Sequence, residues 1–188
     1  MSEQGKTSQD DSRDDDGILL REPIAEDGVQ VAELIAACPP LDENSIYCNL
    51  LQCTDFSETC IVAELDGEIV GWISGYRPPT ERSTLFIWQV AVHAKARGRG
   101  LARRMLERLI QRPACEGVSY LKTTITPDND GSHALFRSFA KRCGAPIRES
   151  TGFEEKAHFQ GLHDSERLIT IGPIPDHAGK GSASLSAA

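Results

Sequence analysis

The sequence predicts an α/β fold in which a mixed sheet is flanked by helices. Apolar, partly β-branched runs alternate along the chain with segments whose apolar residues recur at i, i+3, i+4 and i+7, the spacing of one helix face. Asp66 and Gly67 join two of the apolar runs, which is typical of a β-hairpin. The length of 188 residues, 39% of them hydrophobic, suits one soluble globular domain.

The first part of the domain is expected to hold one strand and two helices. Residues 18–21 form a short apolar run, and the apolar residues from Val31 to Cys38 share one face of a helix. Pro39 and Pro40 end this helix, because proline lacks the amide hydrogen that a helix needs. A second short helix begins near residues 44–45.

The middle of the chain predicts three consecutive strands. Residues 59–65 and 68–76 form the two strands of the hairpin. A proline-rich loop over residues 78–83 then leads to residues 84–92. This run is almost continuously apolar, so we expect a strand that is buried on both faces.

The last part alternates between helices and strands. A glycine-rich turn at residues 97–100 opens an amphipathic helix, and residues 118–125 form a fifth strand. Another helix begins near Asn129, and two weaker strands follow near residues 148–158 and 167–171. The predicted order is therefore β-α-α-β-β-β-α-β-α-β-β.

Composition divides the chain into a folded unit, residues 18–175, and two tails. Residues 1–17 carry six acids against two bases and no apolar periodicity, which predicts a disordered acidic tail. Residues 176–188, rich in Gly, Ser and Ala, predict a flexible tail. Half of the net charge of −8 belongs to the first tail, so the folded unit is acidic as well. This balance disfavours nucleic acid as a partner, because phosphate binding needs a basic face.

The cysteines and the apolar runs indicate the cellular compartment of the protein. None of the six cysteines forms a CxxC pair, and no apolar run is long enough for a membrane span or a secretory signal. We therefore expect reduced thiols, a cytoplasmic protein and no membrane partner.

The segment after the strand at residues 84–92 predicts an anion site. Gly98 and Gly100 can adopt backbone angles that other residues avoid, and they let a ligand approach the main chain. The first amides of the following helix lack partners and carry the positive end of its dipole, and Arg97 and Arg99 add charge. The implied ligand is a phosphate or pyrophosphate. A Walker loop is absent, and a dinucleotide fingerprint would need glycine where Arg103 stands.

What remains, Arg97-x-x-Gly100-x-Ala102 after a strand, resembles the acetyl-CoA loop [RQ]xxGx[GA] of the Gcn5-related N-acetyltransferase (GNAT) superfamily. A second resemblance to this superfamily begins at Asn129, at the start of a helix beside the coenzyme. Phe136 stands there where the superfamily often has a tyrosine that protonates the leaving thiolate. A phenyl ring donates no proton, so Phe136 is expected in the core and the general acid stays unassigned.

The resemblance implies a mostly antiparallel mixed sheet that splays between its fourth and fifth strands, with about four helices. Acetyl-CoA would insert between the splayed strands, its pantetheine arm pairing with main-chain groups of the fourth strand. The implied cofactor residues are Val90, Val92, Arg97, Gly98, Arg99, Gly100, Leu101, Ala102, Asn129 and Ser132.

Four separated strings, at residues 38–47, 88–92, 123–129 and 163–166, are similar to the L-2,4-diaminobutyrate acetyltransferase family of the ectoine pathway. Its members move acetyl from acetyl-CoA to the 4-amino group of diaminobutyrate. The resemblance also implies a homodimer. One departure is Leu162, where the family usually has a glutamate; a neighbour such as Glu166 would have to replace it.

Diaminobutyrate carries two ammonium groups and a carboxylate, so its pocket needs acids and a counter-charge. The expected substrate-binding residues are Asp42, Asn44 and Trp88, and the expected catalytic residues are His163, Tyr47 and Glu166. His163 titrates near neutrality and is a candidate base or relay, and Tyr47 is a candidate proton donor. Other roles stay open: Asp42 as a helix cap, Trp88 in the core, His163 on the surface, and a water chain as base.

No metal is expected. The His, Asp and Glu residues between His158 and Glu166 have no helix or ribbon that would bring them together, and no cysteine lies near them. The predicted reaction is direct attack of the free amine on the thioester. Two rival functions are acetylation of another amine, such as a peptide amino terminus, a lysine or a polyamine, and a non-catalytic acyl-CoA sensor.

Overall fold

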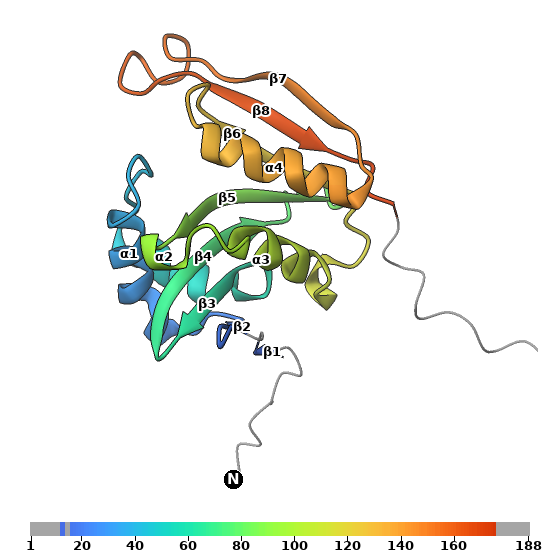
Figure 1. The fold of residues 1–188 in the computed structure, drawn as a ribbon. Coiled ribbons are helices and arrows are strands. Elements are labelled where there is room, and N and C mark those ends of the chain that lie inside the picture. Colours follow the sequence, from blue (N-terminus) through green and yellow to red (C-terminus); the bar gives the residue numbers. More distant parts are fainter. Residues whose placement is uncertain (1–11, 14–15, 176–188) are drawn as a thin grey trace, which may run out of the picture.

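The computed structural model describes residues 12–13 and 16–175, which form one eight-stranded sheet with helices on both faces (Figure 1). The strand order is β1-β2-β3-β4-β5-β6-β8-β7. The strands are β1 (Ser12–Arg13), β2 (Leu19–Arg21), β3 (Ile61–Leu65), β4 (Glu68–Tyr76), β5 (Thr84–Val92), β6 (Tyr120–Ile125), β7 (Ile147–Phe153) and β8 (Glu166–Ile171). The helices are α1 (Gly28–Ala36), α2 (Ile46–Cys53), α3 (Leu101–Ile110) and α4 (Asp130–Cys143).

The predicted class, a mixed and mostly antiparallel sheet with four α-helices, is confirmed. Within residues 12–13 and 16–175, only β5 and β6 pair in parallel, and every other neighbouring pair is antiparallel. The hairpin forms as expected, with Asp66 at φ +54° and Gly67 at φ +83° in its turn. Among the described helices, none is long and apolar enough to cross a membrane.

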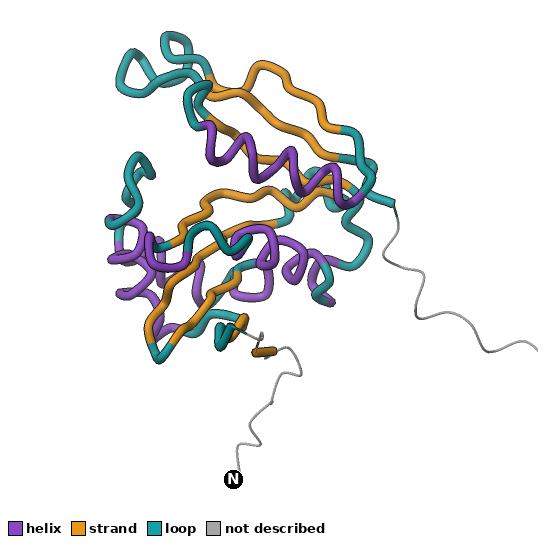
Figure 2. The backbone as a smooth tube through the Cα atoms, viewed as in Figure 1, coloured by secondary structure: helices purple, strands orange, loops and turns teal. Residues whose placement is uncertain are grey.

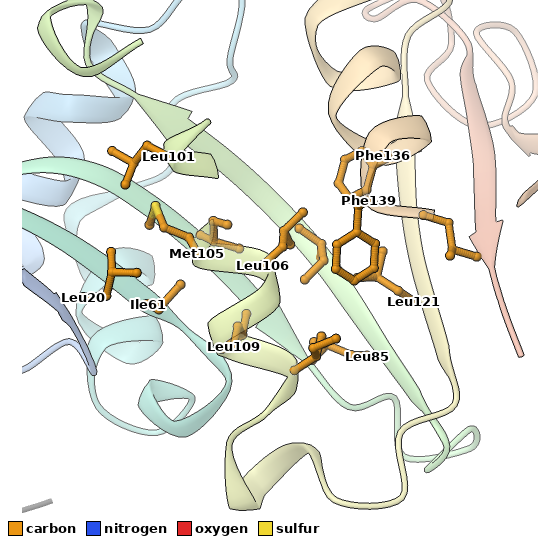
Figure 3. Close-up of a cluster of buried hydrophobic side chains, with 14 of the residues drawn as sticks. Leu20, Ile61, Leu85, Leu101, Met105, Leu106, Leu109, Leu121, Phe136 and Phe139 are labelled. Carbon is orange, nitrogen blue, oxygen red and sulfur yellow. The ribbon is translucent and has the colours of Figure 1, made fainter. Parts of the chain in front are cut away.

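Two hydrophobic clusters hold the helices on the two faces. Met105 and Leu106 of α3 and Phe136 and Phe139 of α4 pack in one cluster with strands β2 to β6 and β8, as Figure 3 shows for part of it. On the other face α1 and α2 pack against residues such as Trp72 of β4 in a second cluster. Burial of these apolar stripes is the main favourable term that fixes the helices.

The sheet splits where the site lies. β5 pairs with β6 only over Thr84–Phe86 and Tyr120–Lys122, and the two strands then diverge (Figure 2). Gly75 pairs with Ile87 while Ser74 pairs with Gln89, so Trp88 is an extra residue that forms a bulge in β5. A bulge bends its strand and increases its twist, which accounts for the divergence just beyond the last pair with β6.

The expectation that residues 84–92 are buried on both faces is wrong. Trp88 is 49% exposed, and Phe86, Val90 and Val92 are half-buried. Continuous burial requires a neighbour on each side and each face of the strand, and β6 leaves β5 after Phe86. The apolar run is long because its second half borders a cavity.

The two predicted tails fall mostly outside the described residues, which omit 1–11, 14–15 and 176–188. Within the first of them, Ser12–Arg13 pairs with β2, and the Asp16 carboxylate lies 2.8 Å from an Arg104 nitrogen. The domain boundaries at residues 17 and 175 stay a prediction.

Candidate active site

A cavity of about 610 Å³ opens at the split between β5 and β6. It is lined by Cys38, Pro39, Pro40, Leu41, Val90, Val92, Ala96, Arg97, Gly98, Gly100, Leu101, Ala102, Arg103, Asn129, Gly131, Ser132, Leu135 and Ser138. All the expected cofactor residues except Arg99 are in this lining. Arg99 is exposed and lies outside the lining. Residues more than 90 positions apart in the chain therefore meet around one hollow.

The glycine turn shapes the end of the cavity where α3 begins. Gly98 and Gly100 have φ of +77° and +67°, in the left-handed region that costs other residues energy. Gly100 is the N-cap of α3, and no side chain of the described residues caps this terminus. The first amides of α3 are thus available to an anion, with the positive end of the helix dipole behind them.

Two arginines stand at the same end. The Arg97 side chain turns back, and its Nε donates to the Val92 carbonyl at 2.8 Å. Arg103, which was not predicted as a cofactor residue, also lines the cavity and pairs with Glu107 at 3.1 Å one turn further along α3. Both guanidinium groups are held by protein contacts close to the helix terminus, so the anion site is preorganised.

The backbone of β5 presents polar groups to the split. The His93 amide donates to the Val70 carbonyl, so in this antiparallel pair the alternate residues Val92 and Val90 direct their groups away from β4. The Val92 carbonyl accepts from Arg97 and from Cys38 Sγ at 3.4 Å, which agrees with this direction. In the described part of the chain, β5 has no strand partner on this side beyond Phe86. An extended ligand arm could pair with Val90 as a strand would.

The start of α4 forms the opposite wall. The Asn129 side chain accepts from the Ser132 amide at 3.0 Å and so caps the helix. Both residues line the cavity, as expected. Phe136 is 2% exposed and packs with Phe139 and Leu121 in the core, which confirms the prediction that it is a core residue.

The expected acceptor residues Asp42 and His163 meet although 121 positions separate them. His163 Nε2 lies 3.2 Å from an Asp42 carboxylate oxygen. His163 Nδ1 lies 2.7 Å from the Asp164 carbonyl, and the ring is 4.7 Å from that of Phe159. Loop 37–45, between α1 and α2, therefore contacts the β7–β8 loop across the open end of the split; in Figure 1 loop 37–45 rises on the same side of the molecule as the β7–β8 loop above it.

A backbone hydrogen bond and three acidic groups raise the pKa of His163 above its usual 6.5. The largest contribution is the hydrogen bond with the Asp164 carbonyl, and the charges of Asp42, Glu166 and Asp164 add to it, while partial burial opposes them. Each of these groups favours the protonated imidazole. The imidazole of His163 thus lies near three carboxylates, those of Asp42, Asp164 and Glu166. This concentration of negative charge suits a cationic ligand.

The other expected acceptor residues are more scattered. Asn44 donates to Gln89 of β5 at 2.8 Å. Trp88 is in edge contact with Tyr76, because the bulge interrupts the alternation that would place it on the face of Val90. Tyr47 lies in the first turn of α2, is 69% exposed and is not among the residues that line the cavity.

Glu166 is the first residue of β8, and Leu162, beside His163, is 90% exposed. Among the described residues, no three His, Cys, Asp or Glu side chains gather as a metal site would require. Gln89, Arg103, Leu135 and Ser138 were not predicted as site residues from the sequence. The helical spacing of Leu135 and Ser138 after Ser132 was a usable signal, whereas nothing local to Gln89 indicates its contacts.

Comparison with known proteins gives consistent results. Residues 29–140 match the model of the acetyltransferase (GNAT) family. The chain is 49% identical over 157 residues to the L-2,4-diaminobutyric acid acetyltransferase of Methylotuvimicrobium alcaliphilum, covering 84% of this chain and 91% of that one. It is 52% identical over 153 residues to the enzyme of the same name from Vibrio parahaemolyticus, covering 81% and 84%.

Among solved structures, the chain resembles diaminobutyrate acetyltransferase EctA from Paenibacillus lautus, which was determined with its substrate L-2,4-diaminobutyric acid and coenzyme A. The TM-score is 0.81 at 40% identity, over 86% of this chain and 98% of that one. The loading GNAT-like domain of CurA from Lyngbya majuscula, at 17% identity and a TM-score of 0.63, shares the fold alone.

Proposed function

The chain belongs to the GNAT acetyltransferase family and, within it, to the L-2,4-diaminobutyric acid acetyltransferases, and from this premise we propose how its site transfers an acetyl group. The substrates are acetyl-CoA and L-2,4-diaminobutyrate, and the product is the N4-acetyl compound that the ectoine pathway cyclises. The observation that carries the assignment is the similarity to EctA, which extends over 98% of a chain solved with both the amino acid and coenzyme A.

Acetyl-CoA lies along the cavity with its pyrophosphate at the start of α3. The amides that follow Gly100, together with Arg97 and Arg103, hold the phosphate oxygens. The pantetheine arm then runs beside Val90, whose backbone groups face the split. Fixing both ends of the arm holds the thioester in one place, which supplies the positioning part of catalysis.

The amine substrate binds at the open end of the split. Asp42, Asp164 and Glu166 provide negative charge around His163 for the ammonium groups of diaminobutyrate. Asn44 and Trp88 contribute to the same pocket, and Glu166 serves in place of the glutamate that Leu162 has replaced. The Leu162 side chain is exposed and uncharged, so it adds no charge that would oppose Glu166.

The reaction is a direct transfer. An alkylammonium has a pKa of about 10.4, so the 4-amino group must lose a proton before it attacks the thioester carbonyl. His163 accepts this proton, directly or through water, with Glu166 beside it. The Val90 amide stabilises the oxyanion, and Tyr47 is the candidate donor to the leaving thiolate. No covalent enzyme intermediate is required.

The cellular compartment and the oligomeric state of the enzyme are part of the same proposal. The six free cysteines suit a reducing compartment, which supports a cytoplasmic enzyme. Resemblance to the family supports a homodimer.

The deciding experiment incubates the purified protein with acetyl-CoA and L-2,4-diaminobutyrate, follows the release of CoA and locates the acetyl group by NMR. The expected result is acetylation of the 4-nitrogen, with lysine and ornithine as poor substrates. Turnover of a peptide amino terminus or polyamine in preference would assign another amine. Tight binding of acetyl-CoA without turnover of any amine would assign a sensor.

A further inference from the structure

Gln89 is a buried polar residue of β5 that the proposed reaction does not use. It is 7% exposed, and both ends of its amide form hydrogen bonds with loop 37–45. We propose that Gln89 is a positioning residue, which holds this loop where Asp42 can reach His163 and so sets the binding of the amine substrate. The inference rests on the proposed function, because it assigns the loop to the amine pocket.

The amide of Gln89 donates one hydrogen bond and accepts the other. Gln89 Nε2 donates to the Asp42 carbonyl at 2.8 Å, and Gln89 Oε1 accepts from Asn44 Nδ2 at 2.8 Å. A carboxylate has no hydrogen to donate to the carbonyl, and an apolar side chain has neither group. Of side chains this length, glutamine is the one that serves both partners.

The position of Gln89 comes from the bulge in β5. Gln89 pairs with Ser74 directly after the extra residue Trp88, and this brings its side chain to the loop that precedes α2. Without the extra residue, the alternation along β5 would place position 89 on the other face of the strand. The bulge therefore both opens the cavity and turns the amide toward the loop.

The contact between Asp42 and His163 is too weak to order the loop itself. The Asp42 side chain is 77% exposed, and an exposed ion pair gains little because water screens it and two side chains lose freedom. The hydrogen bonds of Gln89 are partly buried and arise from a side chain that is 7% exposed, so they tie the backbone at residue 42 to the sheet. The same loop lines the acetyl-CoA cavity through Cys38 and Leu41. The position of the loop therefore sets where the amine substrate lies relative to acetyl-CoA.

Two variants test the proposal kinetically. Gln89→Met removes both hydrogen bonds at similar volume, and Gln89→Glu keeps only the acceptor for Asn44. We expect Gln89→Met to raise the KM for diaminobutyrate at least about ten-fold, since two hydrogen bonds of about 1 kcal/mol each are lost, with a smaller rise in the KM for acetyl-CoA, whose cavity is lined by residues 38–41 of the loop. Gln89→Glu should show a similar rise in the KM for diaminobutyrate. The control is Ser74→Ala, which alters the buried residue paired with Gln89 and leaves both KM values unchanged.

A second measurement needs no turnover, so it separates this inference from the proposed function. The pKa of His163 is followed by NMR in each variant. The groups that face the ring are the Asp164 carbonyl and the carboxylates of Asp42, Asp164 and Glu166, with Phe159 against it. We expect Gln89→Met to lower the pKa of His163 as far as Asp42→Asn does, because the loop no longer holds Asp42 in place.

The outcomes are distinct. An unchanged pKa of His163 in folded Gln89→Met protein overturns the positioning role, whatever the substrate. A lowered pKa in an enzyme that does not acetylate diaminobutyrate supports the positioning role and overturns the proposed function. If Gln89→Met does not fold, Asn44→Ala removes one of the two bonds from the loop side, and an unchanged pKa of His163 there overturns the proposal.

Discussion

At the scale of single residues, His163 is the group whose chemistry depends most on its neighbours. Its Nδ1 donates a hydrogen bond to the Asp164 carbonyl, and its Nε2 contacts the Asp42 carboxylate of a loop on the far side of the split. Both favour the imidazolium and raise its pKa above 6.5. A proton acceptor must be neutral to act, so activity is expected to rise with pH through this raised pKa.

The first prediction concerns Asp42→Asn. Loss of the carboxylate lowers the pKa of His163, because one charge that stabilises the protonated ring is gone. The acid limb of kcat/KM for diaminobutyrate should then move to lower pH. The pKa of His163 should remain raised in this variant, because the hydrogen bond with the Asp164 carbonyl, the largest contribution, is kept. A limb that does not move would mean that another group titrates; Glu116→Gln, an exposed acid away from the site, is the control.

The second prediction concerns Gly98, whose φ is +77°. Nothing lies within 4 Å of a Cβ placed there, so Gly98→Ala acts through backbone strain alone, about 1–2 kcal/mol. The turn relaxes, the amides at the start of α3 shift, and the Kd of acetyl-CoA should rise about ten-fold by calorimetry. Gly98→Asn should retain more affinity, because asparagine tolerates left-handed angles better.

Gly117 provides a matched control for that change. Its φ is +75°, its Cβ position is equally open, and it does not line the cavity. Gly117→Ala should lower the free energy of unfolding by the same amount as Gly98→Ala and leave the Kd of acetyl-CoA unchanged. An equal loss of affinity in both variants would show that the effect of Gly98 is general destabilisation.

At the scale of elements, α4 shows how one terminus serves both stability and binding. The Asn129 side chain caps the helix, and the same residue faces the cavity. The third prediction is that Asn129→Ala lowers the free energy of unfolding by about 1 kcal/mol and weakens acetyl-CoA binding, while Asn129→Asp keeps the cap. Thermal unfolding and calorimetry measure the two effects.

Ser45 caps α2 by accepting from the Cys48 amide at 3.2 Å, so it offers the comparison for Asn129. Ser45→Ala should cost a similar free energy of unfolding without changing the Kd of acetyl-CoA, since α2 does not line that cavity. Equal losses of affinity in Ser45→Ala and Asn129→Ala would contradict a binding role for the α4 terminus.

Most elements were predictable because their causes are local. The periodic apolar stripes of α3 and α4, the Asp66-Gly67 turn and the glycine turn all lie within a few residues of the structure they produce. The bulge at Trp88 was not predictable, because it depends on which residues of β4 pair with β5. The burial of residues 84–92 was mistaken for the same reason.

The residues of the site show the same difference between local and long-range causes. The cofactor residues follow one another in two short motifs, and the structure brings all of them except Arg99 to one cavity. The contacts of Asp42 with His163, and of Asn44 with Gln89, join residues far apart in the chain, and no local pattern encodes them. Candidate residue types were visible in the sequence, whereas their partners required the fold.

At the scale of the whole molecule, the sheet consists of two parts joined by a short parallel pairing. Strands β1 to β5 form one part and β6, β8 and β7 the other, with only three residue pairs between them. The cluster that includes α3 and α4 spans the junction below the split. Acetyl-CoA between β5 and β6 would add the contacts that the strands themselves do not make.

The fourth prediction follows from this arrangement and uses amide hydrogen exchange. The amides of Val90 and Val92 face the split, so they should exchange quickly in the free enzyme and slowly with saturating acetyl-CoA. The Ala91 amide, which faces β4, should be protected in both states. Equal protection of Val90 with and without acetyl-CoA would contradict pairing with the pantetheine arm. Diaminobutyrate alone should leave Val90 and Val92 unchanged.

The unpaired edge of β5 has a further consequence, for the solubility of the enzyme between turnovers. An exposed strand edge accepts any extended peptide, including the same segment of another molecule, and so invites aggregation. The coenzyme that occupies this edge during catalysis would therefore also shield it. When acetyl-CoA runs low, the protein loses substrate and protection together. Purified enzyme should precipitate more slowly on storage with CoA present than without it.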